Sequence, residues 1–206
     1  MADWDENSPR LHANLQAVLA GVAASAAKRE KITLAAIKGW HKAARFGLDV
    51  PSGASVGRFR GEPGLEDERV GVGNAGFNLP GARPELVAGE AERFIEKVQR
   101  GVDGLDGLYP ADRDLDRDGF LAITELAGWA RAQWVRIHPF MNGNGRTARF
   151  ITNAILMRYG LPPAMRLHPR PDGSYGAAGG RAMRGDVEPT IVLVRGLVLD
   201  MIRSPP

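Results

Sequence analysis

The stretch IHPFMNGNGRTARF, which runs from Ile137 to Phe150, carries the most information in this sequence. It places a titratable histidine a few residues before a run of asparagine and glycine, and two arginines follow that run. Residues 123–137 and 145–159 on either side have apolar positions at helical spacing. The stretch is therefore expected to be a loop between two core helices. Gly160 is expected to end the second helix, because two prolines follow it closely.

A glycine-rich loop ahead of a helix favours an anion, since the first N–H groups of a helix have no intrahelical partner. Arg146 and Arg149 lie in the first turns of this helix, and an arginine pair can hold phosphate oxygens in a fixed geometry. Asn144 adds a neutral donor. Taken singly, these residues suit an ordinary Asn-Gly turn. Together with His138, they predict a phosphate site with a titratable group beside it.

Length and composition place limits on the function. The 206 residues suit one domain with a small appendage, and a net charge of +3 is too small to indicate a nucleic-acid partner. There is no cysteine, which excludes disulfides, thiolate metal sites and cysteine nucleophiles. A cytoplasmic location is expected, and export as an effector stays open. No apolar run is long enough to cross a bilayer, so no membrane partner is expected.

The remainder of the chain is expected to be mainly helical. Helices are predicted over residues 11–28, 33–47, 84–99, 123–137, 145–159 and 189–202. Residues 50–83 are rich in glycine and proline and contain two β-prone pieces, SVGRF and RVGVG, which predict a loop with a small hairpin. Residues 101–119 are expected to be a loop. His41 is expected at the surface of its helix.

Residues 138–149, HPFMNGNGRTAR, resemble the signature of the Fic/Doc family, HPFx[D/E]GNGRxxR, without a gap. VGRFRGE, VGVGNAGFNLPGARPELV, WARAQWVRIHPF and SYGAAGGRAMRGDVEP are similar to further parts of the family. The resemblance covers roughly residues 33–199 and implies a mainly α, Fic-like helical bundle with a small β-hairpin flap. It divides the chain into an N-terminal helical extension, residues 1–32, and a Fic-like domain, residues 33–206.

The resemblance implies a protein nucleotidyltransferase. Such an enzyme moves a nucleoside monophosphate, usually AMP from ATP with Mg²⁺, to a Ser, Thr or Tyr hydroxyl of a target protein. His138 would be the general base, a role that an ordinary histidine pKa of about 6.5 suits. The nucleotide would lie against Gly143, Asn144, Gly145, Arg146, Arg149 and Tyr175, with Tyr175 on the nucleobase. The flap residues Val70, Gly71, Val72 and Gly73 would align a target segment by strand addition.

The sequence departs from the family pattern at Asn142, where the family has Asp or Glu. That carboxylate normally binds Mg²⁺, and an amide oxygen brings no charge, so metal binding is expected to be weak. A retained, attenuated transferase is expected. The alternatives are a non-catalytic nucleotide- or calcium-binding interaction module and a transferase of another phosphate-linked group, such as UMP or phosphocholine.

The inhibitory pattern of many family members, [S/T]xxxE[G/N], is not found. In the nearest stretch, SAAKREK at residues 25–31, Glu30 falls one position late. Either a separate antitoxin-like partner supplies the inhibitory helix, or the protein is not restrained in this way. Toxin and secreted effector roles both stay open.

A second motif, DLDRDGFLAITE at residues 114–125, fits the calcium-loop pattern D-x-D-x-D-G-x5-E. The predicted Ca²⁺ ligands are Asp114, Asp116, Asp118, the carbonyl of Phe120 and Glu125. The structural alternative is an acidic loop ahead of a helix, where the negative charge favours the helix dipole. Bound calcium would fix the start of the helix that ends near His138.

Overall fold

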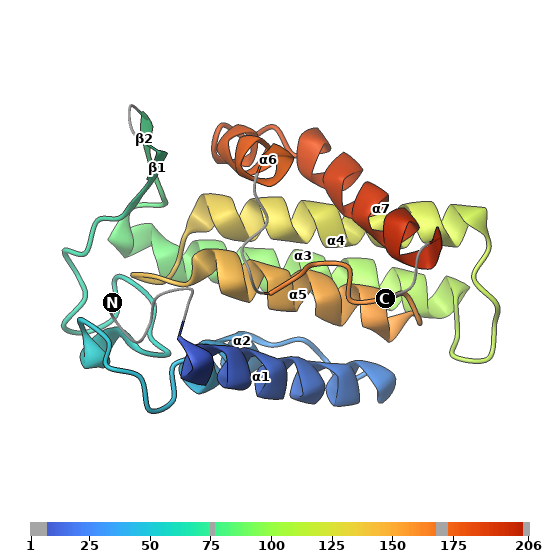
Figure 1. Cartoon of the computed structure of the whole chain (residues 1–206). Coiled ribbons are helices and arrows are strands. Elements are labelled where there is room, and N and C mark those ends of the chain that lie inside the picture. The colour runs from blue at the N-terminus through green and yellow to red at the C-terminus, as the bar shows by residue number, and fades with distance from the viewer. Residues whose placement is uncertain (1–7, 75–76, 168–172, 204–206) are drawn as a thin grey trace.

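The computed structural model describes residues 8–74, 77–167 and 173–203. These residues form seven α-helices, one short 3-10 helix and one hairpin, which confirms the expected mainly α fold with a small flap (Figure 1). The elements are α1 Pro9–Ala27, α2 Leu34–Ala43, η1 Gly53–Ser55, β1 Gly71–Asn74, β2 Phe77–Pro80, α3 Pro84–Leu108, α4 Arg117–Ile137, α5 Asn144–Arg158, α6 Ser174–Met183 and α7 Glu188–Arg203.

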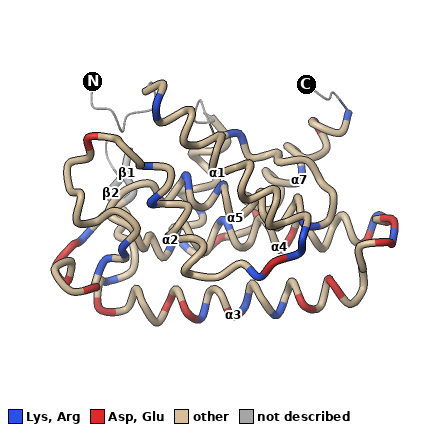
Figure 2. The backbone as a smooth tube through the Cα atoms, turned by 90° about the horizontal axis from the view of Figure 1, so that it is seen from below, with Lys and Arg blue, Asp and Glu red and all other residues tan. Residues whose placement is uncertain are grey.

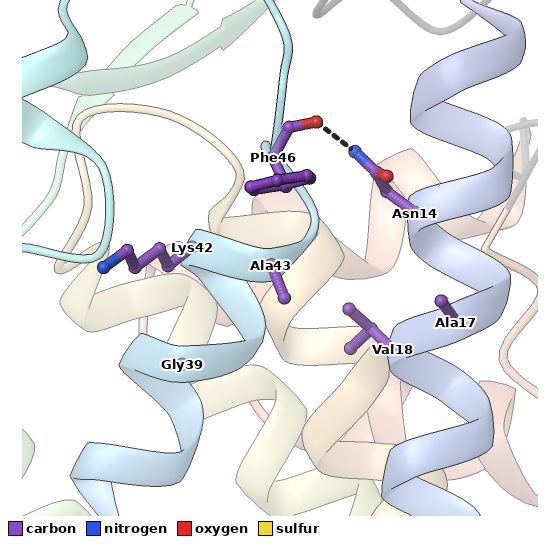
Figure 3. A pocket seen from close by; sticks show the side chains of 7 residues that line it. All are labelled: Asn14, Ala17, Val18, Gly39, Lys42, Ala43 and Phe46. Carbon is purple, nitrogen blue, oxygen red and sulfur yellow. Dashed lines mark hydrogen bonds between the residues drawn. The ribbon is translucent and has the colours of Figure 1, made fainter.

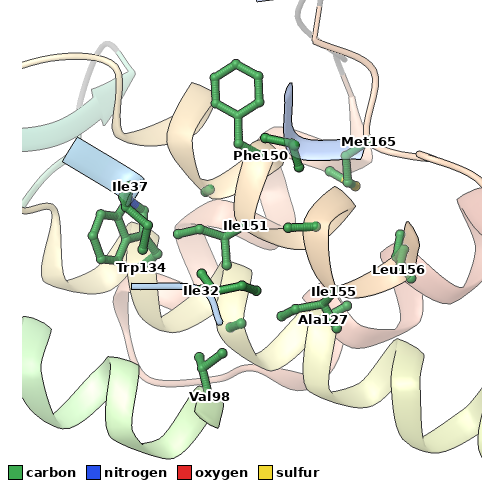
Figure 4. Packing of buried hydrophobic residues seen from close by; sticks show 14 of the residues in the cluster. Ile32, Ile37, Val98, Ala127, Trp134, Phe150, Ile151, Ile155, Leu156 and Met165 are labelled. Carbon is green, nitrogen blue, oxygen red and sulfur yellow. The ribbon is translucent and has the colours of Figure 1, made fainter. Parts of the chain in front are cut away.

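Helix α4 is the centre of the bundle, and it packs against α3, α5, α6 and α7 (Figure 1). Helix α5 also contacts α1 and α2, and residues 147–156 of α5 are buried on every face. The core between these helices includes Trp134, Ile151 and Ile155 (Figure 4). Trp134 Nε1 donates a hydrogen bond to Thr147 Oγ1 at 2.8 Å, so one buried polar contact fixes α4 against α5.

Several helix ends follow local signals. The Thr33 hydroxyl accepts from the N–H of Ala36 at 3.1 Å and caps α2. Gly160, with φ of +76°, follows the last residues of α5 as expected. Helix α2 ends at Ala43, earlier than predicted, so Phe46 lies beyond the helix and is 79% exposed.

The predicted loop at residues 101–119 is wrong over most of its length. Helix α3 continues to Leu108, and α4 begins at Arg117. The glycines at the end of α3 suggested a break, because glycine is a poor helix former. Val102 and Leu105 are nevertheless buried on the face of α3 that joins the core, and this packing outweighs the propensity.

The hairpin pairs β1 with β2 in antiparallel register, with Val72 opposite Leu79. Of the two β-prone pieces, only RVGVG contributes a strand, since SVGRF begins at the end of η1 and then turns at Gly57, where φ is +75°. The hairpin base is tied to the bundle: Gly81 N–H donates to the Val70 carbonyl, and Ala82 N–H donates to the Ile137 carbonyl at 3.0 Å. The tip residues 75–76 lie outside the described residues.

Charged residues of both signs alternate along α3 (Figure 2). This mixed surface agrees with the low net charge. Among the described residues, none of the helices has the length and apolar character needed to cross a bilayer. Helix α1 packs against α5, and the division into residues 1–32 and 33–206 stays a prediction.

Candidate active site

The turn at His138 ends α4 and aims the imidazole. His138 adopts a left-handed conformation, with φ of 53° and ψ of 55°. Its Nδ1 lies 3.1 Å from the carbonyl of Val135, and since a carbonyl can only accept, Nδ1 carries the proton. Nε2 of the neutral ring therefore has a free lone pair. Burial lowers the pKa of His138 to about 4, against the opposing hydrogen bond to Val135. At neutral pH this histidine is therefore unprotonated and able to act as a base, but a weaker base than a histidine with the ordinary pKa of 6.5.

Arg60 holds this turn in place. Its side chain is 1% exposed, and Nε donates to the His138 carbonyl at 2.9 Å. Its Nη groups donate to the carbonyls of Glu68, at 3.1 Å, and Ala82, at 2.8 Å. One guanidinium thus joins the histidine turn to both sides of the hairpin. The sequence pattern does not predict this role for Arg60, although Arg60 belongs to the stretch VGRFRGE that resembles the family.

Phe140 and Asn144 fix the first part of the loop. Phe140 is fully buried and stacks on His41, with ring centroids 3.8 Å apart. The Asn144 side chain accepts from the Phe140 N–H and donates to the Phe140 carbonyl, each at 2.8 Å. Both polar atoms of the side chain thus hold the loop, and a contact of its second N–H with a phosphate stays a prediction. The backbone N–H of Asn144 stays part of the predicted anion site.

His41 is a buried support for the loop, and the expectation that it lies at the surface is wrong. It is 2% exposed, accepts from the Gly57 N–H at Nδ1, and contacts the Asn142 carbonyl through Nε2 at 2.9 Å. Since Nδ1 accepts, Nε2 must carry the proton. Burial, followed by the nearby Arg45 charge, lowers the pKa of His41 to about 3. The ring is therefore neutral at physiological pH.

The N-terminus of α5 begins where the loop ends. Gly143 has a φ of +81°, which favours glycine, and α5 starts at Asn144. A Cβ built on Gly145 would meet no heavy atom within 4 Å, so the space beside this first turn is open. An anion can approach the N–H groups at the start of α5 from this side.

The residues at this site do not fit a protein-bound Mg²⁺. The Asn142 side chain is exposed, and its Oδ1 accepts from the Gly143 N–H at 2.6 Å. It offers one neutral oxygen that already has a partner, whereas Mg²⁺ prefers carboxylates. No group of three or more His, Cys, Asp or Glu side chains within residues 8–74, 77–167 and 173–203 could hold a metal ion.

The two arginines of the motif have different surroundings. Arg146 is partly buried in the first turn of α5. Arg149 is 2% exposed, and its Nη atoms donate to the Tyr175 hydroxyl and the Leu167 carbonyl, each at 3.2 Å. Its Nε is buried without a hydrogen-bond partner among the described residues. Arg149 is thus held by two hydrogen bonds, and its Nε–H remains available as a donor.

Tyr175 has little exposed surface, and the placement of a nucleobase on its ring stays a prediction. It is 5% exposed, and the Arg131 guanidinium lies 4.0 Å from its ring centroid. Burial would raise the pKa of Tyr175, but the charges of Arg131 and Arg149 outweigh burial and lower it. The structure gives Tyr175 a supporting contact with Arg149.

The predicted calcium-loop geometry at residues 114–125 is also wrong. Helix α4 begins at the fourth position of the motif, and Gly119 lies inside the helix. Asp116 Oδ1 accepts from the Gly119 N–H at 2.8 Å as an N-cap, and the Tyr109 hydroxyl donates to it at 3.0 Å. Glu125 lies two turns into the helix. The side chains of Asp114, Asp116, Asp118 and Glu125 do not form a metal-binding group.

An apolar pocket of about 470 Å³ lies away from this loop, between α1 and α2 (Figure 3). Its lining contains none of the residues 138–149 and consists of Asn14, Ala17, Val18, Gly39, Lys42, Ala43 and Phe46. It lacks the histidine and the motif arginines that phosphate chemistry needs. The candidate site is therefore the loop between α4 and α5.

Comparison with known proteins agrees with this geometry. The Protein adenylyltransferase Fic of Nematostella vectensis is 46% identical over 103 residues, which cover 43% of this chain. The match spans 24% of that relative, so the chain covers only a part of it.

Two solved structures share the fold. A Fic-domain-containing signaling protein from Bacteroides thetaiotaomicron has a TM-score of 0.67 at 18% identity, covering 94% of this chain and 69% of its own. The BepC effector of Bartonella tribocorum, with bound AMPPNP, has a TM-score of 0.60 at 14% identity, covering 94% of this chain and 88% of its own. At such identities, these two show the fold alone. A model of the Fic/DOC family matches residues 31–156, more than half of the chain. The chain belongs to the Fic/DOC family.

Proposed function

We propose that this chain is a protein nucleotidyltransferase that moves AMP from ATP to a hydroxyl of a target protein. The observation that carries the proposal is the neutral His138, with Nε2 free, one short loop away from the open N-terminus of α5. The relative in Nematostella vectensis is named a protein adenylyltransferase, and the BepC structure holds AMPPNP. Both support ATP as the donor.

In this mechanism, His138 Nε2 takes the proton of a Ser, Thr or Tyr hydroxyl, and the hydroxyl oxygen attacks the α-phosphorus. A new P–O bond forms, the bond to the oxygen that bridges the α- and β-phosphates breaks, and pyrophosphate leaves. The charge on the leaving group is stabilised by the N–H groups of the first turn of α5 and by Arg146 and Arg149. Since the site offers no fitting ligands for Mg²⁺, no step is assigned to a metal.

The flap presents the target segment in this proposal. Its base lies against the histidine turn, because a Cβ built on Gly81 would be 2.6 Å from His138 Cβ. A strand added along residues 70–73 would therefore run past the imidazole. Mutation of this edge should lower transfer to protein without lowering nucleotide binding.

A separate antitoxin-like partner is part of the proposal. None of the ion pairs formed among the described residues includes Arg149, so no carboxylate of that part of the chain restrains it. In this proposal Arg149 holds the γ-phosphate of ATP, so a partner helix whose glutamate pairs with Arg149 would block that phosphate. Co-purification of a small protein that suppresses the labelling of target proteins would support this inhibitory partner.

The experiment uses purified protein, cell lysate as a source of targets, and α-labelled ATP, GTP, CTP or UTP. Label on protein that vanishes in His138→Ala establishes the transferase and identifies the nucleotide donor. Absence of label with every nucleotide contradicts the proposal. Phosphocholine transfer is tested in parallel with a labelled CDP-choline donor.

Asn142 favours a second candidate, a non-catalytic nucleotide-binding module, because it lacks the carboxylate of the family pattern. The variant Asn142→Asp separates the two. The binding module would be supported if the wild-type chain binds nucleotide without transferring it and the Asn142→Asp variant transfers it with Mg²⁺. Transfer by both proteins supports the enzyme.

A further inference from the structure

Arg45 lies against the loop at the start of α5. It follows the last residues of α2 and is 7% exposed. A Cβ built on Gly143 would be 2.7 Å from Arg45 Nη1 and 2.9 Å from Cζ, so the guanidinium packs on the backbone of Gly143. Arg45 Nη2 is buried and has no hydrogen-bond partner among the described residues. A buried charge of this kind is costly unless an anion accompanies it.

The position of Arg45 follows from the end of α2 and the turn after it. His41, four residues earlier in α2, contacts the carbonyl of Asn142. The last turn of α2 and the turn that follows it therefore face residues 142 and 143. Arg45 also lies near Arg146, since the Arg146 charge, together with the larger effect of burial, lowers the pKa of Arg45 to about 10. Arg45 remains a cation at neutral pH.

The family pattern has a carboxylate at position 142, one residue before the Gly143 backbone on which this guanidinium packs. Asn142 is neutral, and its own side-chain oxygen is bound to the Gly143 N–H. The positive charge of Arg45 is therefore left to act on whatever anion occupies the N-terminus of α5. None of the ion pairs of the described part of the chain involves Arg45.

We propose that Arg45 is a third cationic residue of the phosphate site, and that with Asn142 it lets a di- or triphosphate bind without a divalent cation. The inference deepens the proposed function, since it concerns the same phosphate site. It is separable from that function, because phosphate binding can be measured without any transfer reaction. The ligand class is a linked pair of phosphates, which inorganic pyrophosphate represents.

The test is calorimetric titration of the full chain with inorganic pyrophosphate in EDTA at about 0.15 M salt, where exposed charges are screened. Arg45→Met should weaken binding about tenfold, which is about 1.4 kcal/mol. Arg45→Lys keeps the charge and should lose less. Lys42→Met is the matched control, since it removes an exposed charge from the same helix, and it should change affinity less than about twofold.

A second measurement covers the case in which Arg45→Met does not fold. In the ¹⁵N spectrum of unmodified protein, the Arg45 Nε–H signal, assigned by its absence in Arg45→Lys, should shift with pyrophosphate at the calorimetric affinity. The inference is overturned if the Arg45 signal does not shift, or if Arg45→Met and the wild-type protein bind pyrophosphate with equal affinity. Absence of pyrophosphate binding without metal also overturns it. In each of these cases Mg²⁺-dependent protein labelling would still support the proposed transferase.

Discussion

Replacement of Arg60 by methionine should be among the most damaging single changes near the site. The guanidinium donates to the carbonyls of His138, Glu68 and Ala82, and also approaches that of Ile137 at 3.3 Å. Methionine fills most of the volume but donates nothing. Loss of the three hydrogen bonds to His138, Glu68 and Ala82, at about 1 kcal/mol each, predicts a loss of about 3 kcal/mol in the free energy of unfolding, without counting the longer bond to Ile137. For a chain of this size, that is a decrease in Tm of roughly 6–12 °C.

Thermal and urea unfolding, followed by far-UV circular dichroism, measure this change. Arg58→Met is the matched control, since Arg58 lies two residues away and is partly exposed; it pairs with Glu62 at 3.5 Å and donates to the carbonyls of Ala54 and Pro63 in exposed contacts. Exposed contacts of this kind are worth about 0–1 kcal/mol. If Arg60→Met is as stable as Arg58→Met, the hydrogen bonds of Arg60 do not hold the histidine turn. Arg60→Lys should lie between the two, because one ammonium replaces the wide guanidinium fork.

Three further predictions concern other contacts. The pKa of His41 is 6.5 in the unfolded chain and about 3 in the folded chain. Between these values the unfolded chain binds more protons, so the free energy of unfolding falls as pH decreases from 6.5 towards 3. Urea titrations should show that His41→Gln removes up to about 1.4 kcal/mol per pH unit of this dependence. Asp116→Ala should cost about 1 kcal/mol in thermal unfolding through the lost cap on Gly119 N–H, and millimolar Ca²⁺ should leave the Tm of the unmodified chain unchanged. Tyr175→Phe should cost about 1 kcal/mol and weaken pyrophosphate binding measured by calorimetry, since Arg149 loses one of its two partners.

The fold could be predicted where local signals and packing agree. The apolar spacing of residues 123–137 and 145–159 and the position of Gly160 all correspond to the observed helices. The end of α3 could not be predicted, because its glycines argue against a helix while the buried Val102 on the core face argues for it. Only the folded core shows that packing prevails.

The calcium motif failed for a different reason. The same acidic residues that make a calcium loop also make good helix N-caps, and the sequence pattern does not separate the two. The Tyr109 hydroxyl and the Gly119 N–H both bind Asp116 Oδ1, so this carboxylate is committed to the start of α4. Tyr109 lies at the end of the preceding helix, a contact that the spacing of the motif does not contain.

The site was predictable only within its own loop. His138 and the helix that begins at Asn144 follow from one short stretch of sequence. The residues that hold this loop come from elsewhere: Arg60 is 78 positions from His138, and His41 is 101 positions from Asn142. No periodicity connects residues at such separations. Their roles emerge when the bundle brings α2 and the hairpin base to the end of α4.

The charges around α5 form a consistent set once these distant residues are included. Arg45, Arg146 and Arg149 surround the first turns of α5, where the helix dipole adds further positive potential. The nearby Asn142 and His41 side chains are neutral and do not compensate these cations. Such an arrangement repels a free cation and strongly attracts a polyanion. The loss of a carboxylate at position 142 is therefore better explained as a change in how the site balances phosphate charge than as the loss of the site.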